Sequence, residues 1–162
     1  MSTDPLNRLD GWQKAIQDLP AKKVQRYCLG FAFHPVKGVV LIRKNRPEWQ
    51  AGKLNGVGGK IEAGESPEQA MAREFEEETG YHTVSSDWMF RGHCVGSDFT
   101  IDVFTMVLPQ YSIVSTTTDE EIVTQGVYTL GDDVLPHVEA LIHCCLMRIG
   151  AKEAVPFFTF HY

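Results

Sequence analysis

The residues with the clearest chemical potential lie in one short stretch, residues 59–81, which reads GKIEAGESPEQAMAREFEEETGY. Within it, Glu74, Glu77 and Glu78 recur at the spacing that brings side chains to one face of a helix. Like charges at this spacing destabilise a helix by about 0.2–0.5 kcal/mol per pair. Hard divalent cations prefer oxygen ligands, so a bound cation would turn the repulsion into coordination. The stretch therefore indicates a metal site, and the alternative is a solvated acidic helix face.

The same stretch carries the signals that begin and end a helix. Ser66 is a good N-cap, Pro67 suits the first helical position, and Gln69 stands where the partner of a capping box belongs. Gly80 is a natural C-terminal stop. At about 3.6 residues per turn the charged residues share one sector of this helix. The opposite sector would pack on the core through Met71, Ala72, Phe75 and Thr79.

These residues match a known family. The stretch resembles the Nudix box, G-x5-E-x7-R-E-U-x-E-E-x-G-U with U apolar, at every specified position. The matching residues are Gly59, Glu65, Arg73, Glu74, Phe75, Glu77, Glu78, Gly80 and Tyr81. Phe75 and Tyr81 are aromatic where aliphatic residues are commoner. The resemblance implies an α/β fold, the Nudix-type α/β/α sandwich around a mixed β-sheet.

The resemblance also implies a metal site. Glu77 and Glu78 would be direct ligands, together with the backbone carbonyl of Gly58. Glu74 would be a further ligand or the base that activates water. Mg²⁺ is the expected cofactor, with Mn²⁺ as a substitute.

Other charged residues would support this site. Arg73 would hold a glutamate by a charge-assisted hydrogen bond, and Glu65 would bind metal through water or orient its neighbours. Many Nudix proteins also use an acidic residue late in the chain. Asp119, Glu120 and Glu121 lie in a suitable place, and Glu121 is the preferred candidate. The alternative for these three residues is a solvated loop.

The chemistry implied by the resemblance is Mg²⁺-dependent hydrolysis of phosphoanhydride bonds in nucleoside diphosphate derivatives. Metal ions neutralise phosphate oxygens and lower the pKa of water, and a carboxylate can accept the proton. The lead-in LNGVGGKIE is similar to that of MutT-like members. It favours a nucleoside triphosphate pyrophosphohydrolase of the 8-oxo-dGTP type, which releases monophosphate and pyrophosphate. The alternatives are cleavage of ADP-ribose, a nucleotide sugar or a dinucleoside polyphosphate, and a sensor module without turnover.

Candidate substrate contacts precede the box. Asn55 is a candidate for base recognition, and its alternative is a turn residue before Gly56. Trp49 could stack on a base or cap the core. A basic run could face the phosphates, or could be ordinary loop charge: Arg43, Lys44, Arg46, Lys53 and Lys60. Of these, Arg43, Lys44 and Lys60 are the preferred substrate contacts.

Hydrophobic periodicity predicts the elements that must position these residues. Bulky and small residues alternate over residues 27–33, which is typical of a strand with two different faces. The full expected order is a helix over 4–18, strands over 27–33 and 39–42, the box helix, a strand pair over 88–95 and 101–108, a strand over 122–130 and a helix over 138–149 stopped by Gly150. The aromatic tail FFTFHY is expected to pack on the core, and otherwise to cover a dimer partner or to edge the cleft.

Composition sets broader limits. The 162 residues suit one domain, with residues 1–20 as an N-terminal helical extension and 21–162 as the catalytic fold. Apolar residues at 43% and charged residues at 22% are ordinary for a soluble globule. A net charge of −6 argues against binding of a nucleic acid polymer. No apolar run approaches the roughly 20 residues of a membrane span. The expected partner is a small nucleotide, and a homodimer is left open.

The 4 cysteines show no spacing typical of zinc ligands and no catalytic arrangement. The N-terminal residues do not have the pattern of a signal peptide. Reduced thiols and a cytoplasmic location are therefore expected.

Overall fold

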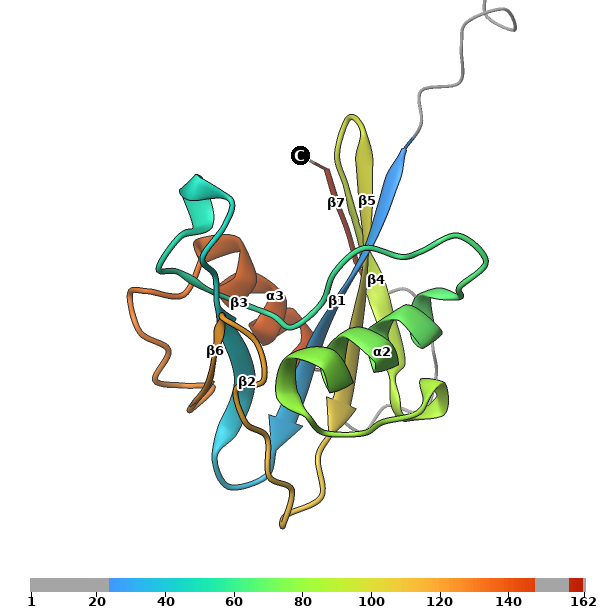
Figure 1. Cartoon of the computed structure of the whole chain (residues 1–162). Coiled ribbons are helices and arrows are strands. Elements are labelled where there is room, and N and C mark those ends of the chain that lie inside the picture. The colour runs from blue at the N-terminus through green and yellow to red at the C-terminus, as the bar shows by residue number, and fades with distance from the viewer. Residues whose placement is uncertain (1–23, 148–157, 162) are drawn as a thin grey trace, which may run out of the picture.

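The structure is a computed structural model that describes residues 24–147 and the backbone of residues 158–161. Its strands form one mixed seven-stranded sheet (Figure 1). They are β1 (Gln25–His34), β2 (Gly38–Arg43), β3 (Leu54–Asn55), β4 (Met89–Val95), β5 (Phe99–Val107), β6 (Glu121–Gln125) and β7 (Phe158–His161). The helices are α2 (Pro67–Thr79) and α3 (Pro136–Leu146), with the 3-10 turns η1 (Glu48–Gln50) and η2 (Ser85–Asp87). The helix predicted over residues 4–18 and the stop at Gly150 lie outside the described residues.

The two α-helices cover opposite faces of the sheet (Figure 1). The small β1 residues Cys28 and Ala32 belong to the core cluster under α2, whereas the bulky Leu29, Phe31 and Phe33 belong to the cluster under α3. Alternate residues of a strand face opposite sides, so one strand serves both cores. This arrangement confirms the predicted α/β/α sandwich and the two unlike faces of residues 27–33.

Helix α2 packs closely on β1 because Gly30 lacks a side chain. A Cβ atom there would lie 2.6 Å from Met71 Cε and 2.8 Å from Trp88 Cζ3. Gly30→Ala is therefore expected to lower the free energy of unfolding by about 1–3 kcal/mol, as measured by urea denaturation. Adding Met71→Ala should make the combined loss smaller than the sum of the two single losses. An unchanged midpoint in the Gly30→Ala variant would contradict this close packing.

Strand order in the sheet is β3-β2-β1-β5-β4-β7, with β6 paired to β2. The predicted strand pair is confirmed: β4 and β5 are antiparallel and joined around residues 96–98. Part of the aromatic tail, β7, lies parallel to β4 and forms an edge of the sheet. Strand β6 ends at Gln125 rather than at the predicted residue 130, because a turn closed by Thr129 N–H to Gly126 O at 3.0 Å follows.

Strands β1 and β2 separate at the end of the sheet that carries the box. They are paired only at Phe33–Val39 and His34–Gly38, near their connecting turn. Farther along, β1 pairs instead with the segment that leads into the box. Gly30 N–H donates to Val57 O at 2.7 Å and Cys28 N–H to Gly59 O at 2.9 Å. The glycine-rich lead-in is thereby placed between β1 and α2.

The ends of α2 form as the sequence predicts. The Ser66 side chain accepts the Gln69 N–H at 3.2 Å, and the Gln69 side chain accepts the Ser66 N–H at 2.8 Å. Gly80 has a left-handed φ of 67° and closes the helix. The described helices include none that is long and apolar enough to span a membrane.

Candidate functional site

Arg73 organises three of the box glutamates. Its Nε and Nη2 donate to the two oxygens of Glu65 at 2.8 and 3.1 Å. Nη1 donates to Glu74 Oε1 at 2.8 Å and reaches Glu77 Oε2 at 3.5 Å. Nη2 also donates to the Lys60 carbonyl at 3.1 Å, which ties α2 to the lead-in. The bonds from Arg73 keep the pKa of Glu65 below its usual value.

Glu78 lies at the opposite side of the carboxylate cluster, against the glycine lead-in. Its Oε2 accepts the Gly58 N–H at 3.2 Å. Burial raises the pKa of Glu78 to about 7, the positive charge of Lys44 opposes the rise, and the charges of Glu74 and Glu120 add to it. The charges of Lys44 and Glu120 therefore both act on Glu78.

Glu120 is the late acidic residue that the fold brings to this cluster. It is buried, its Oε1 accepts the Asn45 N–H at 2.7 Å, and its Oε2 contacts the Lys44 ammonium. Glu121, the preferred sequence candidate, points elsewhere and pairs with Arg43 at 3.1 Å. The structure thus favours Glu120 over Glu121 as the acidic residue of the site.

The positions of Glu120 and Glu121 differ because they lie on either side of the start of β6. Ile122 packs against the α2 core and Val123 against the α3 core. Glu121 alternates with Ile122 and so lies on the side of Val123, whereas Glu120 directly precedes β6 and is buried beside Lys44. Arg43, the last residue of β2, pairs with Glu121 and also with Asp133 at 3.0 Å, whereas Lys44 directly follows the strand.

Gly58 and Gly59 let the lead-in approach its neighbours closely. A Cβ atom on Gly59 would lie 2.5 Å from Glu74 Cδ and 2.6 Å from both carboxylate oxygens. A Cβ atom on Gly58 would lie 2.2 Å from the Cys28 carbonyl oxygen. The backbone therefore forms one wall of the carboxylate cluster, and a side chain at residue 59 would displace Glu74 whereas one at residue 58 would meet backbone atoms.

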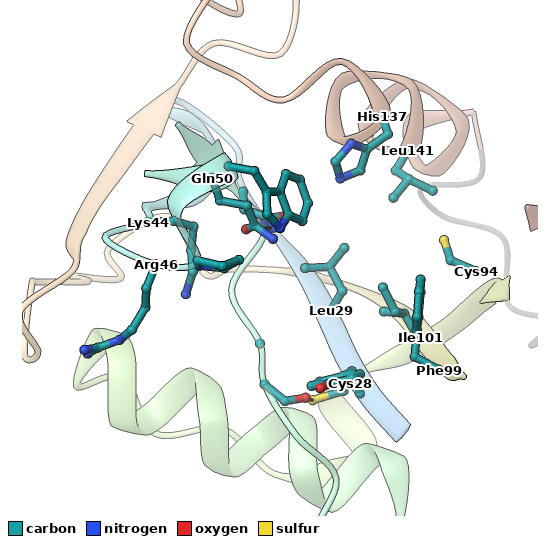
Figure 2. Close-up of a pocket in the computed structure, with 17 residues that line it drawn as sticks. Cys28, Leu29, Lys44, Arg46, Gln50, Cys94, Phe99, Ile101, His137 and Leu141 are labelled. Carbon is teal, nitrogen blue, oxygen red and sulfur yellow. Dashed lines mark hydrogen bonds between the residues drawn. The ribbon is translucent and has the colours of Figure 1, made fainter. Parts of the chain in front are cut away.

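A cavity of about 710 Å³ opens beside this wall. Its lining includes the charged residues Lys44 and Arg46, the glycines Gly58 and Gly59, and the apolar residues Phe99, Ile101 and Leu141. Figure 2 shows Lys44 and Arg46 on the loop after β2, across the cavity from the β4–β5 hairpin. The cavity thus meets the glycine lead-in against which Glu74 and Glu78 lie.

Trp49 and His137 stand together on the cavity wall. Their ring centroids lie 6.3 Å apart and the rings are tilted by 43°. Trp49 is 65% exposed, so it lines the cavity and does not cap the core. Burial lowers the pKa of His137, which favours the neutral ring. No signal in the sequence indicated that His137 would line this cavity. His137 lies in the first turn of α3, which is far from the box in the sequence.

The predicted substrate contacts are only partly brought together. Asn55, Lys44 and Trp49 line the cavity. Arg43 and Lys60 are not among the lining residues; Lys60 contributes its carbonyl to Arg73 and its side chain is exposed. The Asn55 side chain accepts the Gly56 N–H at 2.8 Å and donates to Gln50 at 3.0 Å, so the turn role is present.

The donor set fits a hard divalent cation. The charged groups around Gly58 and Gly59 are carboxylates, and oxygen ligands suit Mg²⁺ and Mn²⁺. Burial and neighbouring carboxylates raise the pKa of Glu78, and an added positive charge would relieve that repulsion. Among the described residues no group of three His, Cys, Asp or Glu side chains is already arranged as a metal site. Arg73 pairs with Glu65, Glu74 and Glu77, and Lys44 pairs with Glu120.

The fold and the site together define a Nudix-type domain. Residues 27–129 match the family model described as NUDIX domain. The chain therefore belongs to the Nudix hydrolase family, as the box predicted, and its resemblance to MutT-like members is confirmed.

Individual relatives agree with this assignment. The 8-oxo-dGTP diphosphatase of Escherichia coli (strain K12) is 41% identical over 59 residues, which cover 36% of this chain and 45% of that protein. The chain thus matches less than half the length of this curated relative. A NUDIX hydrolase from Nitrosomonas europaea superposes with a TM-score of 0.70 at 13% identity, covering 88% of this chain and 81% of the other. A MutT NUDIX hydrolase from Burkholderia pseudomallei superposes with a TM-score of 0.62 at 18% identity, and the match covers 75% of this chain and 97% of the other. These structures support the fold alone.

Proposed function

We propose that this protein hydrolyses the phosphoanhydride bonds of a nucleoside triphosphate of the 8-oxo-dGTP type in a Mg²⁺-dependent reaction, and releases a monophosphate and pyrophosphate. One observation carries the proposal: Glu78 and Glu74 lie against Gly58 and Gly59, and these two glycines also line a cavity that has apolar and aromatic residues in its wall. Such a cavity suits a molecule with a polyphosphate at one end and a base at the other. The relative from Escherichia coli supports the choice of substrate.

The residues divide the work as follows. Glu77, Glu78 and the Gly58 carbonyl would hold the ion, and a bound divalent ion would supply charge neutralisation and a more acidic water. Glu74, oriented by Arg73 at 2.8 Å, would be a further ligand or accept the proton of the attacking water. Glu65 would keep Arg73 in place, and Glu120 would complete the carboxylate set from the loop just before β6.

Trp49 is the proposed stacking surface for the base. Trp49→Ala is expected to raise KM by roughly 5- to 150-fold, since stacking of a base on an aromatic ring is worth about 1–3 kcal/mol, while kcat changes little. Steady-state kinetics with the preferred triphosphate measures both constants. Tyr128→Ala is the matched control, because Tyr128 is an aromatic residue that is 87% exposed and does not line the cavity. Equal KM values in the two variants would show that Trp49 does not bind the base.

A panel of phosphoanhydrides tested with Mg²⁺ decides the substrate class. Oxidised and ordinary nucleoside triphosphates should be cleaved faster than ADP-ribose, nucleotide sugars and dinucleoside polyphosphates. If ADP-ribose were hydrolysed faster than every triphosphate, the proposed triphosphate substrate would be wrong, but the proposal that the protein is a phosphoanhydride hydrolase would stand. The sensor alternative is disfavoured because every box glutamate is present, and turnover of any member of the panel would rule it out.

A further inference from the structure

Lys44 occupies an unusual electrostatic position in this site. Its ammonium contacts Glu120 Oε2, and only 18% of the Lys44 side chain and 8% of the Glu120 side chain are exposed. It is also the main favourable charge acting on Glu78. Lys44 therefore contacts one carboxylate in the loop just before β6 and acts by its charge on a second one in α2.

The charges of Glu78, Glu120 and Lys44 indicate how a divalent ion would affect Lys44. Glu78 and Glu120 carry two negative charges when ionised, and Lys44 supplies one positive charge. Arg73 is engaged with Glu65, Glu74 and Glu77 by the bonds described above. A divalent ion beside Glu78 and Glu120 would by itself balance these two charges, and it would compete with the ammonium for the Oε2 atom of Glu120. Because like charges repel, the ion and the ammonium disfavour each other at this place.

The Lys44 ammonium could move into the cavity when an ion displaces it, because Lys44 is one of the residues that line the cavity. Lys44 lines the cavity, and its side chain is a flexible four-carbon stem with a compact charge at its tip. Figure 2 shows Lys44 on the cavity side of the loop after β2. Its neighbour Arg46 pairs with Asp119 at the exposed rim, with side chains 76% and 63% exposed, and so belongs to a different environment.

We propose that Lys44 is an internal counter-cation, which holds Glu78 and Glu120 together in the metal-free protein, yields that place to the divalent ion, and then turns into the cavity toward the phosphate of the substrate. This inference rests on the divalent ion of the proposed function. It makes Lys44 a competitor of the metal in the absence of substrate. It also makes metal and phosphate binding cooperative, because each favours the same position of Lys44.

Binding of Mn²⁺ to the protein without substrate tests this inference. The free Mn²⁺ signal in electron paramagnetic resonance gives the Kd for wild type and for Lys44→Met, which keeps an unbranched stem and removes the charge. Loss of the competitor should tighten Mn²⁺ binding by at least about fivefold. In EDTA the same variant should melt at a lower temperature than wild type, because Glu78 and Glu120 then repel. Lys37→Met, in the exposed β1–β2 turn, is the control with the same change of net charge.

The outcomes separate the two proposals. A Lys44→Met variant that binds Mn²⁺ as wild type does, or more weakly, overturns the role of Lys44 alone. A wild type that binds no Mn²⁺ overturns both this role and the divalent ion of the proposed function. Should Lys44→Met not fold, Lys44→Arg decides the question. Its charge and its planar fork should hold Glu120 more firmly and weaken Mn²⁺ binding, and equal or tighter binding would overturn the inference.

Discussion

Replacing Glu78 with glutamine is expected to lower kcat for a nucleoside triphosphate by more than about 100-fold without unfolding the protein. Groups that merely support metal ligands typically change activity about 10- to 100-fold when they are replaced, so loss of a direct ligand should exceed that range. The amide oxygen of glutamine can still accept the Gly58 N–H, which Glu78 accepts at 3.2 Å. Removing a carboxylate that is buried beside Glu74 and Glu120 should leave the melting temperature equal or higher.

The matched control is Glu76→Gln. Glu76 lies on the same helix, but its side chain is 51% exposed and faces His82 at 2.9 Å. Its replacement changes net charge equally and should leave kcat within about twofold, because a surface ion pair contributes little. Equal kcat values in Glu78→Gln and Glu76→Gln would mean that the carboxylate of Glu78 takes no part in the reaction.

Gly59→Ala should produce the second large effect. The new methyl group would lie 2.5–2.6 Å from the carboxylate of Glu74. The end of a flexible side chain can move aside, so we expect little change in melting temperature. The carboxylate would, however, leave the position in which Arg73 holds it. A displacement of about 1 Å in a catalytic group can reduce the rate about 100-fold, and a loss of that order in kcat is predicted.

Gly58→Ala provides the contrast to this variant. There the methyl group would meet the Cys28 carbonyl at 2.2 Å and the Leu29 Cα at 3.0 Å, and these backbone atoms cannot rotate away. This variant should lose about 1–3 kcal/mol or more of stability, measured by urea denaturation. If Gly59→Ala kept full activity, or if both variants were equally destabilised, the close approach of the lead-in to Glu74 would be refuted.

Local signals allowed much of the fold to be predicted from the sequence. The caps at Ser66 and Gly80 depend on neighbouring residues alone, and both formed as expected. The alternation in residues 27–33 reports burial on both sides of a strand, and it correctly predicted two unlike cores. The box helix and its charged sector follow from the same short-range rules.

The parts that could not be predicted depend on pairings between distant segments. Choosing Glu120 over Glu121 requires knowing where β6 begins and which face of it meets α2. Choosing Lys44 over Arg43 requires the same knowledge of β2. The cavity depends on the separation of β1 from β2, and its residue His137 comes from a helix far along the chain. Short-range periodicity contains none of this information.

The structure also revises how the carboxylates are understood. The sequence predicted that they converge on a cation, and two cationic side chains of the protein itself already meet them. Arg73 holds Glu65, Glu74 and Glu77, which orients them, whereas Lys44 lies beside Glu78 and Glu120. In the proposed mechanism Arg73 is a permanent organiser and Lys44 a replaceable one.

The most direct test of the central claim is phosphorus NMR of 8-oxo-dGTP incubated with the purified full-length protein, first in EDTA and then after addition of Mg²⁺. The account predicts an unchanged spectrum in EDTA, followed by equal amounts of nucleoside monophosphate and pyrophosphate once Mg²⁺ is present. Hydrolysis at the same rate in EDTA, or an intact triphosphate in the presence of Mg²⁺, would contradict it.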